Sequence, residues 1–207
     1  MKLLAILGAS GHGKVVAEIA RAAGWDQVEF YDDAWPAKAQ IGIWQIVGDT
    51  SALLMSSERF SGVVVAIGSN VIRLQKLQEL QAAGLTLATI VHPAAIVSES
   101  ASLGVGTVVM AGAVINADAR IGLGAILNTG CGVDHDCVLG EAVHISPGAH
   151  LAGDVHVGDR SWIGIGASVR QGQRIGAGVM VGAGAAVVTD ITDDVIAVGV
   201  PARVLTD

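Results

Sequence analysis

The sequence is poor in aromatic residues, in charge and in cysteine. Only 3% of its 207 residues are Phe, Trp or Tyr and 15% are charged, while 52% are hydrophobic. Any core must therefore be filled with Val, Ile, Leu and Ala, and intrinsic disorder is excluded. The 28 glycines follow no Gly-X-Y period, which excludes a collagen. Two cysteines, Cys131 and Cys137, are too few for a disulfide framework and are interpreted as buried thiols.

The sequence also lacks the features of several partner classes. The net charge is −7, and no lysine follows Lys76, so no basic face is available to track a nucleic-acid backbone. No run of about twenty uncharged apolar residues could span a membrane. The apolar stretch near Met1 is too short for a signal peptide. We therefore expect a cytoplasmic protein that has no membrane span and does not bind nucleic acid.

The first part of the chain alternates short apolar runs with helical patterns. We expect strands over 2–7, 28–31, 63–67 and 85–90, and helices over 15–23, 50–59 and 70–83. Such alternation predicts a parallel sheet of the Rossmann type over residues 1–88, with its ligand crevice at the carboxyl ends of the strands.

After residue 88 the sequence pattern changes to a strict six-residue repeat. Seventeen consecutive positions of this repeat hold Leu, Ile or Val, beginning at Val91 and ending at Val187. The residue four positions after each aliphatic residue is usually small, and the residue directly after the aliphatic residue is often glycine. This period predicts a parallel β-helix over residues 89–207, in which three hexapeptides make one triangular coil and a C-terminal tail leaves the repeat. A narrow prism also explains why aromatic residues are scarce.

The glycine-rich stretch 8–14 resembles two nucleotide-binding motifs without matching either. Gly8, Gly13 and Lys14 have the P-loop spacing, but Val15 replaces the Ser or Thr that would hold Mg²⁺. Val16 stands where a dinucleotide fingerprint needs its last glycine. What remains is a glycine turn that leads into a helix N-terminus, which favours anions.

His135 is the candidate for proton transfer. It lies two residues past an interior position, on the wall of the predicted prism, and Asp136 follows it. An imidazole oriented by a carboxylate can act as a general base. The alternative is an exposed histidine between two acids. We expect no metal site, because His144, His150 and His156 are six residues apart and would lie on three different faces.

Three motifs carry a family resemblance. Gly199-Val-Pro-Ala-Arg203 resembles the tail of hexapeptide-repeat acyltransferases with a left-handed β-helix. Combined with the turn Gly8-Ala-Ser-Gly-His-Gly13, and with the stretch from Ile126-Leu-Asn-Thr129 through Val133-Asp-His-Asp-Cys137 to His144, the chain resembles the PglD-type nucleotide-sugar N-acetyltransferases and the related sialic acid O-acetyltransferases.

The resemblance implies a homotrimer with active sites between neighbouring left-handed prisms, and acetyl-CoA as co-substrate without a metal. His135 matches the catalytic base, Asp136 the acid that raises its basicity, and Asn128 a supporting polar residue. The positions that match cofactor contacts are His144, Ile165 and Ala183. Those that match nucleotide-sugar contacts are Ser10, Gly11, His12, Asp32, Asp33 and Gly68. Because cations are scarce, Arg170, Arg174 and Arg203 are candidates for the CoA phosphates.

The function expected from these features is an acetyl-CoA-dependent N-acetyltransferase of glycan biosynthesis. Its expected acceptor is the amine of a nucleotide-linked sugar, such as a UDP-4-amino-4,6-dideoxy sugar. Two alternatives stay open. One is O-acetylation of a sialic acid or related sugar, and the other is a trimeric scaffold that binds a sugar nucleotide without catalysis.

Overall fold

The computed structural model describes residues 1–205. The chain forms two compact units, Met1–Pro93 and Ala94–Asp207, close to the boundary expected after residue 88. The last two residues of the expected C-terminal tail, 206 and 207, lie outside the described part. Within that part, no helix is long and apolar enough to cross a membrane.

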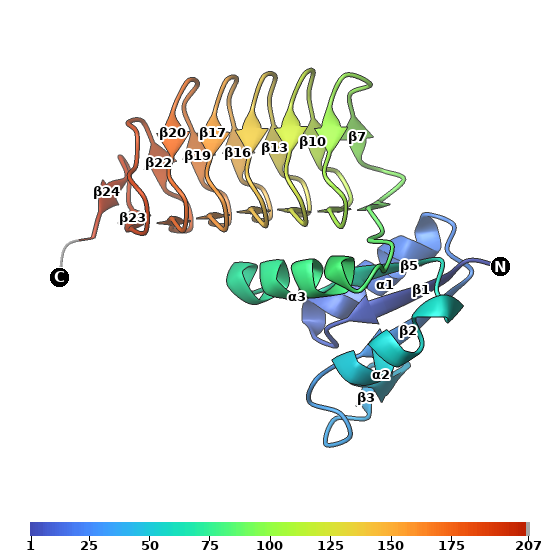
Figure 1. Cartoon of the computed structure of the whole chain (residues 1–207). Helices are drawn as coiled ribbons and strands as arrows, with labels where there is room; N and C mark the ends of the chain where they lie inside the picture. The colour runs from blue at the N-terminus through green and yellow to red at the C-terminus, as the bar shows by residue number, and fades with distance from the viewer. Residues whose placement is uncertain (206–207) are drawn as a thin grey trace. The chain divides into compact units, whose positions relative to one another are not determined.

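The first unit is a five-stranded sheet flanked by helices, as the Rossmann-type prediction requires (Figure 1). The strands lie in the order β3-β4-β2-β1-β5, and β1, β2, β4 and β5 run parallel. Their bounds are β1 Leu3–Leu7, β2 Gln27–Tyr31, β3 Gln40–Ile41, β4 Trp44–Gly48 and β5 Gly62–Val65. Strand β6, Ile90–Val91, is not part of this sheet but is the edge strand next to β9. The helices are α1 Gly11–Ala22, α2 Thr50–Met55 and α3 Asn70–Ala82, with a 3₁₀ turn at Ser57–Arg59.

Three details of this unit differ from the sequence prediction. The hairpin of β3 and β4 was not expected, and the helix predicted over 50–59 is divided into α2 and the 3₁₀ turn. The strand predicted over 85–90 is formed only in part. Only one isolated bridge, between Val63 and Leu87, joins this segment to the sheet. Its apolar residues are buried as an extended connection instead, Leu87 and Ala88 being 8% exposed.

The second unit is a parallel β-helix with three flat faces (Figure 1). From β7 to β22 each hexapeptide contributes one two-residue strand, and strands eighteen residues apart pair in parallel. The β15 face contains β9 Val108–Val109, β12 Ile126–Leu127, β15 His144–Ile145, β18 Trp162–Ile163, β21 Met180–Val181, β23 Ile196–Val198 and β24 Arg203–Val204. The β13 face contains β7 Ile96–Val97, β10 Val114–Ile115, β13 Gly132–Val133, β16 His150–Leu151, β19 Ser168–Val169 and β22 Ala186–Val187. The β14 face contains β8 Ser102–Leu103, β11 Arg120–Ile121, β14 Val138–Leu139, β17 His156–Val157 and β20 Arg174–Ile175.

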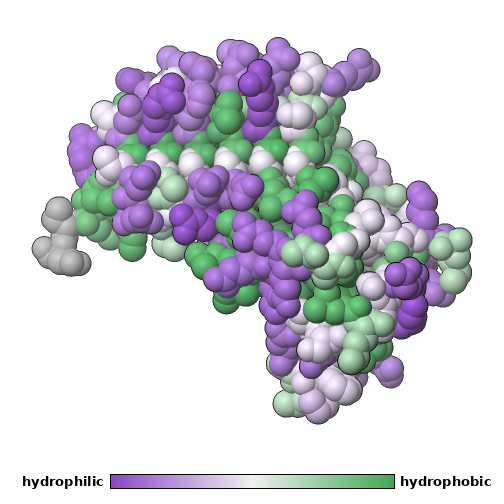
Figure 2. All heavy atoms as spheres, in the orientation of Figure 1, coloured by the Kyte–Doolittle hydropathy of each residue, from purple (hydrophilic) through white to green (hydrophobic). Residues whose placement is uncertain are grey.

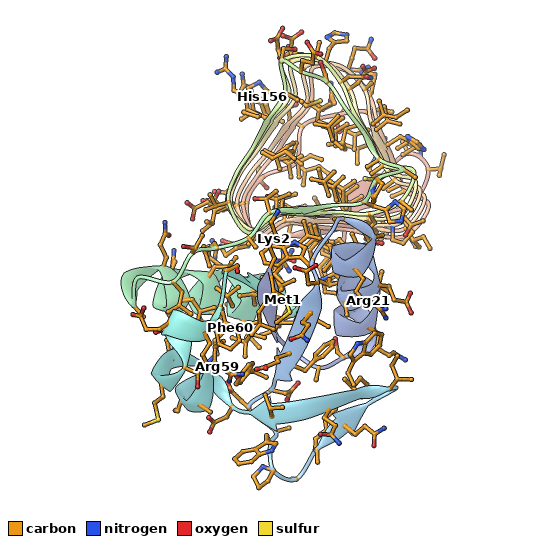
Figure 3. All side chains as sticks on the ribbon, turned by 90° about the vertical axis from the view of Figure 1, so that its right-hand side faces the viewer. Met1, Lys2, Arg21, Arg59, Phe60 and His156 are labelled. Carbon is orange, nitrogen blue, oxygen red and sulfur yellow. The ribbon has the colours of Figure 1, made fainter. Side chains whose placement is uncertain are left out.

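The predicted aliphatic positions fill the interior of this prism. Each is the second residue of its strand, and those from Val109 to Val187 are all buried. Viewed along its axis, the prism has a three-sided section with side chains packed inside it and others, such as His156, on its wall (Figure 3). In the space-filling view, hydrophobic residues form a continuous band along the prism (Figure 2).

The C-terminal tail covers the last coil. β23 pairs with β21, and β24 folds back antiparallel onto β23. Backbone N–H groups of Ala186 and Ala202 donate to the carbonyls of Gly199 and Ala186, at 3.0 and 2.8 Å. These bonds satisfy the open edge that a β-helix otherwise presents, as the departure from the repeat predicted.

Candidate active site

The imidazole of His135 lies at the corner between the β13 and β14 faces. Its Nδ1 is 2.8 Å from Oδ2 of Asp136, so Nδ1–H donates to the carboxylate and Nε2 is left as the basic nitrogen. Both side chains are exposed, at 59% and 60%. Asp136 has φ +61°, a left-handed conformation that Asp tolerates at a tight corner. One residue thus makes the corner and orients the base.

The surrounding carboxylates favour the protonated form of His135. The hydrogen bond with Asp136 raises the pKa of His135 above its usual value, and the charges of Asp134, Asp136 and Asp154 act in the same direction. A nearby anion stabilises an imidazolium. The arrangement is therefore suited to accepting a proton, as the sequence interpretation of His135 and Asp136 requires.

A hollow of about 470 Å³ on the β15 face brings together four of the predicted residues. Asn128, His144, Ile165 and Ala183 all line it. Ile165 is 57% exposed, so the hollow offers apolar surface beside the main chain of the later coils. An open groove of this kind suits an extended ligand with an amide-rich arm.

Asn128 fixes the protonation of His144 at one nitrogen. The side-chain Oδ1 of Asn128 accepts from the backbone N–H of Thr129 at 2.8 Å, so its Nδ2 must face Nε2 of His144 at 3.1 Å. An amide N–H can only donate. Nε2 therefore accepts, and the proton of the neutral ring is on Nδ1, which is itself buried.

The sequence analysis missed Trp162 and Ser146 in this hollow. The indole packs on the His144 ring at a centroid distance of 4.3 Å, and its Nε1 donates to Oγ of Ser146 at 2.7 Å. Trp162 follows His144 by eighteen residues and is paired with it across the sheet. The hexapeptide period could therefore have identified this neighbour.

The two groups of side chains lie on different sides of one prism. The His135 corner is bounded by the β13 and β14 faces, whereas the hollow opens on the β15 face. In a triangular section, a corner is opposite the face that does not form it. A single chain therefore does not bring His135 together with His144.

The Rossmann-type unit gathers its predicted residues at the carboxyl ends of its strands. The turn of Gly8, Ala9 and Ser10 follows β1, and the carboxylate of Asp32 after β2 accepts from the N–H of Ala9 at 2.7 Å. Gly8 has φ +111°, and a Cβ there would lie 2.8 Å from the carbonyl oxygen of Ala66. Only glycine allows this close approach of the β1 and β5 ends.

His12 is mostly buried at the start of α1, beside a buried arginine. Burial, together with the charge of Arg73, lowers the pKa of His12 to about 4. Its Nε2 is buried and has no hydrogen-bond partner among residues 1–205. Guanidinium nitrogens of Arg73 donate to the carbonyls of Ile67 and Gly68 and to Oδ1 of Asn70. Arg73 therefore shapes the loop of Gly68, and His12 is a neutral imidazole at neutral pH.

Asp33 is tied to neighbouring elements at both carboxylate oxygens. Oδ1 accepts from the N–H and hydroxyl of Thr50, at 2.9 and 2.6 Å, and Oδ2 lies 3.0 Å from Nζ of Lys76. The hydrogen bonds with Thr50 and Lys76 outweigh burial and lower the pKa of Asp33. Asp33 consequently stays ionised, and its first role is to join the end of β2 to α2 and α3.

The remaining candidates are less well placed. Arg174 lines a hollow on the β14 face with His156, and a guanidinium nitrogen of Arg203 donates to the carbonyl of Ala202. Neither these two nor Arg170 line the hollow of His144, so their contact with CoA stays a prediction. Both cysteines are buried as expected, and burial raises the pKa of Cys131 to about 12.

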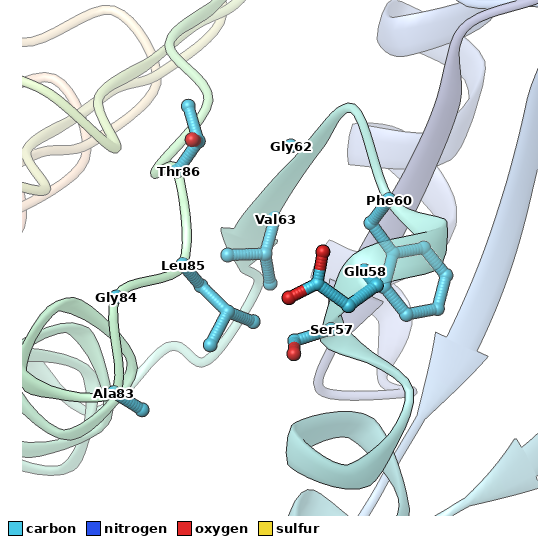
Figure 4. A pocket seen from close by; sticks show the side chains of 9 residues that line it. All are labelled: Ser57, Glu58, Phe60, Gly62, Val63, Ala83, Gly84, Leu85 and Thr86. Atoms are coloured by element: carbon cyan, nitrogen blue, oxygen red, sulfur yellow. The ribbon is translucent and has the colours of Figure 1, made fainter.

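A separate hollow of about 220 Å³ lies at the opposite end of β5, lined by Glu58, Phe60 and Thr86 among others (Figure 4). None of the predicted site residues lines it. His144, His150 and His156 begin successive strands and lie on three different faces. Over residues 1–205, no three His, Cys, Asp or Glu side chains gather where a metal could bind.

Comparisons with known proteins agree on one group. Residues 3–80 match the PglD N-terminal domain family. The acetyltransferase domain of PglB from Neisseria gonorrhoeae is 44% identical, with a TM-score of 0.93, and the match covers 99% of this chain and 100% of that one. PerB from Caulobacter crescentus, solved with CoA and GDP-perosamine, is 44% identical, with a TM-score of 0.94 and 100% and 98% coverage.

WeeI from Acinetobacter baumannii matches at 26% identity, with a TM-score of 0.88 and 99% and 100% coverage. A search of curated proteins finds no match. Because the crystallographic matches span the whole chain, they confirm the predicted fold class, a Rossmann-like parallel sheet followed by a left-handed parallel β-helix.

Proposed function

The chain belongs to the PglD-type hexapeptide-repeat sugar acetyltransferases, and on this premise we propose that it transfers the acetyl group of acetyl-CoA to the amine of a nucleotide-linked amino sugar. The observation that carries the proposal is the hydrogen-bonded pair of His135 and Asp136, which leaves Nε2 of His135 as a base. This pair stands within a chain that is 44% identical to a protein solved with CoA and GDP-perosamine.

The chemistry is a direct transfer. Nε2 of His135 takes a proton from the sugar amine as the amine nitrogen attacks the thioester carbonyl of acetyl-CoA. The C–S bond of the tetrahedral intermediate then breaks, and the imidazolium returns a proton to the CoA thiolate. Asp136 stabilises the imidazolium between these steps.

Each unit has its own ligand in this proposal. The glycine turn at the start of α1, with Ser10, Gly11 and His12, receives the diphosphate, and Asp32, Asp33 and Gly68 border the rest of the nucleotide. The hollow of Asn128, His144, Ile165 and Ala183 receives the acetyl end and pantetheine arm of acetyl-CoA. We place the reaction in the cytoplasm, where acetyl-CoA and nucleotide sugars are made.

We further propose that the active enzyme is a homotrimer. The His135 corner and the β15 face cannot meet within one prism, but a corner of one chain can face the hollow of its neighbour. Three prisms around a threefold axis repeat this contact three times. The split arrangement of the candidate site supports this assembly.

Thiol release from acetyl-CoA, measured with a panel of UDP- and GDP-linked amino sugars, tests the function. We expect turnover with at least one nucleotide-linked amine and a loss of about 10²–10⁴-fold in His135→Ala. His150→Ala, which removes an exposed imidazole from the β13 face, is the matched control and should keep its activity. Near-normal turnover in His135→Ala would remove the base assignment.

The same assay separates the alternatives. An alkali-labile product formed from a sialic acid, with no dependence on a nucleotide, would instead show an O-acetyltransferase. Nucleotide-sugar binding without thiol release from any acceptor would show the non-catalytic scaffold.

A further inference from the structure

The imidazole of His135 is exposed, yet its position is defined from three directions. Asp136 holds Nδ1 from the same corner. Two other contacts come from residues that the proposed chemistry does not use, one on the backbone of His135 and one beneath its ring. Both depend on the stacking of neighbouring coils.

The first contact is a clamp between two coils. Oδ1 of Asp134 accepts from the backbone N–H of His135 at 2.8 Å and from Nδ2 of Asn116 at 2.9 Å. Asn116 occupies the equivalent position in the preceding coil, eighteen residues earlier. The hydrogen bond from the His135 N–H and that from Asn116 lower the pKa of Asp134, so the clamp is ionised at neutral pH. It ties the backbone of the base to the coil before it.

The second contact is with Gly153 in the coil that follows, a residue without a side chain. A Cβ on Gly153 would lie 2.5 Å from both Cε1 and Nε2 of His135, so the ring occupies the space that any side chain at 153 would need. In this column of positions eighteen residues apart, Ala117 precedes His135 and Gln171 follows Gly153, and Gly153 does not have a positive φ. The backbone therefore tolerates a side chain in this column, and the glycine is required by the ring.

We propose that Asp134, clamped by Asn116, and the bare Gly153 are positioning residues that hold the imidazole of His135 in its reactive orientation. The inference rests on the proposed role of His135 as the base. With the backbone tied on one side and the ring seated on Gly153 on the other, the contact with Asp136 is kept without burial. The three residues act through His135 and touch no substrate.

Gly153→Ala tests the seat beneath the ring. We expect kcat to fall about 10–100-fold, because a displacement of about 1 Å at a catalytic group has this effect, while KM for both substrates changes less than about twofold. Gly132→Ala is the matched control, since its Cβ would lie 2.4 Å from Nδ1 of His150 and crowds a different imidazole in the same way. Unchanged kcat in Gly153→Ala, or an equal fall in Gly132→Ala, would overturn the proposal.

Two variants of Asp134 separate its positioning role from the effect of its charge on the pKa of His135. In Asp134→Asn the amide oxygen can still accept both hydrogen bonds, so the high-pH plateau of kcat should stay within about threefold of the parent. Its acid limb should move to lower pH, because one anion near His135 is lost. Asp134→Ala removes both bonds and should lower the plateau about tenfold or more. Equal plateaus in the two variants would overturn the clamp.

A spectroscopic readout keeps this inference distinct from the proposed function. In ¹⁵N NMR of histidine-labelled protein, Gly153→Ala should shift the Nδ1 and Nε2 signals of His135, whereas Gly132→Ala should shift those of His150. This result does not require turnover. Unmoved His135 signals in Gly153→Ala would refute the seat, while absent thiol release in the parent protein would refute only the acetyltransferase.

Discussion

At the residue scale, His135 is the proposed base, and the carboxylate of Asp136 helps to set the pH at which its imidazole loses a proton. The pKa of His135 is raised by the hydrogen bond to Asp136 and by three nearby carboxylates. A base acts only when it is deprotonated, so its reaction must slow as the pH falls through this raised value. The pH dependence of the rate therefore reports the electrostatics of the prism corner.

We expect the acid limb of kcat/KM in the parent enzyme to lie above pH 6.5, the usual pKa of histidine. In Asp136→Asn the limb should move to lower pH, because the anion that stabilises the imidazolium is lost, and the plateau should fall about tenfold. The substrate amine titrates identically in both measurements. A difference between the two profiles over pH 5–9 therefore belongs to the enzyme, and superimposable limbs would contradict the assignment.

His12 makes a second prediction, about stability. Its pKa is about 4 in the folded protein and 6.5 in the unfolded chain, so the unfolded chain binds more protons between these values. The contribution of neutral His12 to the free energy of unfolding is therefore fully present above pH 6.5. It declines by up to ~3 kcal/mol as the pH falls toward 4. His12→Gln should lack this part of the slope. Urea unfolding at pH 7, 6 and 5 measures it, and parallel slopes would contradict the burial of a neutral imidazole.

The sequence could predict that Asp136 contacts the imidazole of His135, because the two residues are adjacent. It could not predict the tautomer of His144, which depends on the amide of Asn128 sixteen residues away. The same holds for the charge of Arg73 beside His12. A contact between residues that are distant in sequence can be identified only in the folded structure. A contact between adjacent residues can be predicted from the sequence.

At the scale of the element, the prism was predictable because its contacts follow a fixed offset in sequence. From β7 to β22 each strand pairs with a strand eighteen residues away, so the aliphatic period alone defines faces, corners and interior. The Rossmann-type unit has no such repeat. There β3 has only two residues, too short to be recognised from alternation, and the apolar segment 85–90 has the composition of a strand but forms only one isolated bridge to the sheet.

The glycines of the repeat serve two physical purposes, which substitution can separate. A Cβ on Gly122 would lie 2.5 Å from the backbone oxygen of Gly140 in the next coil, whereas Gly148 has φ +63° and open space around it. We expect Gly122→Ala to lower the free energy of unfolding by roughly 3 kcal/mol, because backbone cannot move aside. Gly148→Ala should lower it by only about 1 kcal/mol of left-handed strain.

Chemical denaturation of the two glycine variants measures this difference, and both should retain the circular dichroism of the parent. Equal losses would mean that the stacked coils can separate locally. The close approach of successive coils would then not be what requires glycine at this corner.

At the scale of the whole molecule, the decisive fact is that the candidate residues do not converge in one chain. His135 is at the corner opposite the face that carries Asn128 and His144. The repeat could predict that separation, because the three residues have different phases in an eighteen-residue coil. It could not predict which surfaces of two prisms meet, because that depends on the shape and chemistry of exposed side chains.

Mixed trimers test whether the site is shared. If His135 of one chain works with His144 of its neighbour, His135→Ala and His144→Ala proteins are each inactive alone, but every mixed trimer contains one site with both imidazoles. Random assembly makes about three quarters of the trimers mixed, so about one quarter of the parent activity should return. Co-expression with two affinity tags, followed by thiol-release assay and light scattering, measures activity and assembly together. A site confined to one chain would stay inactive in every mixture, because no chain then carries both histidines.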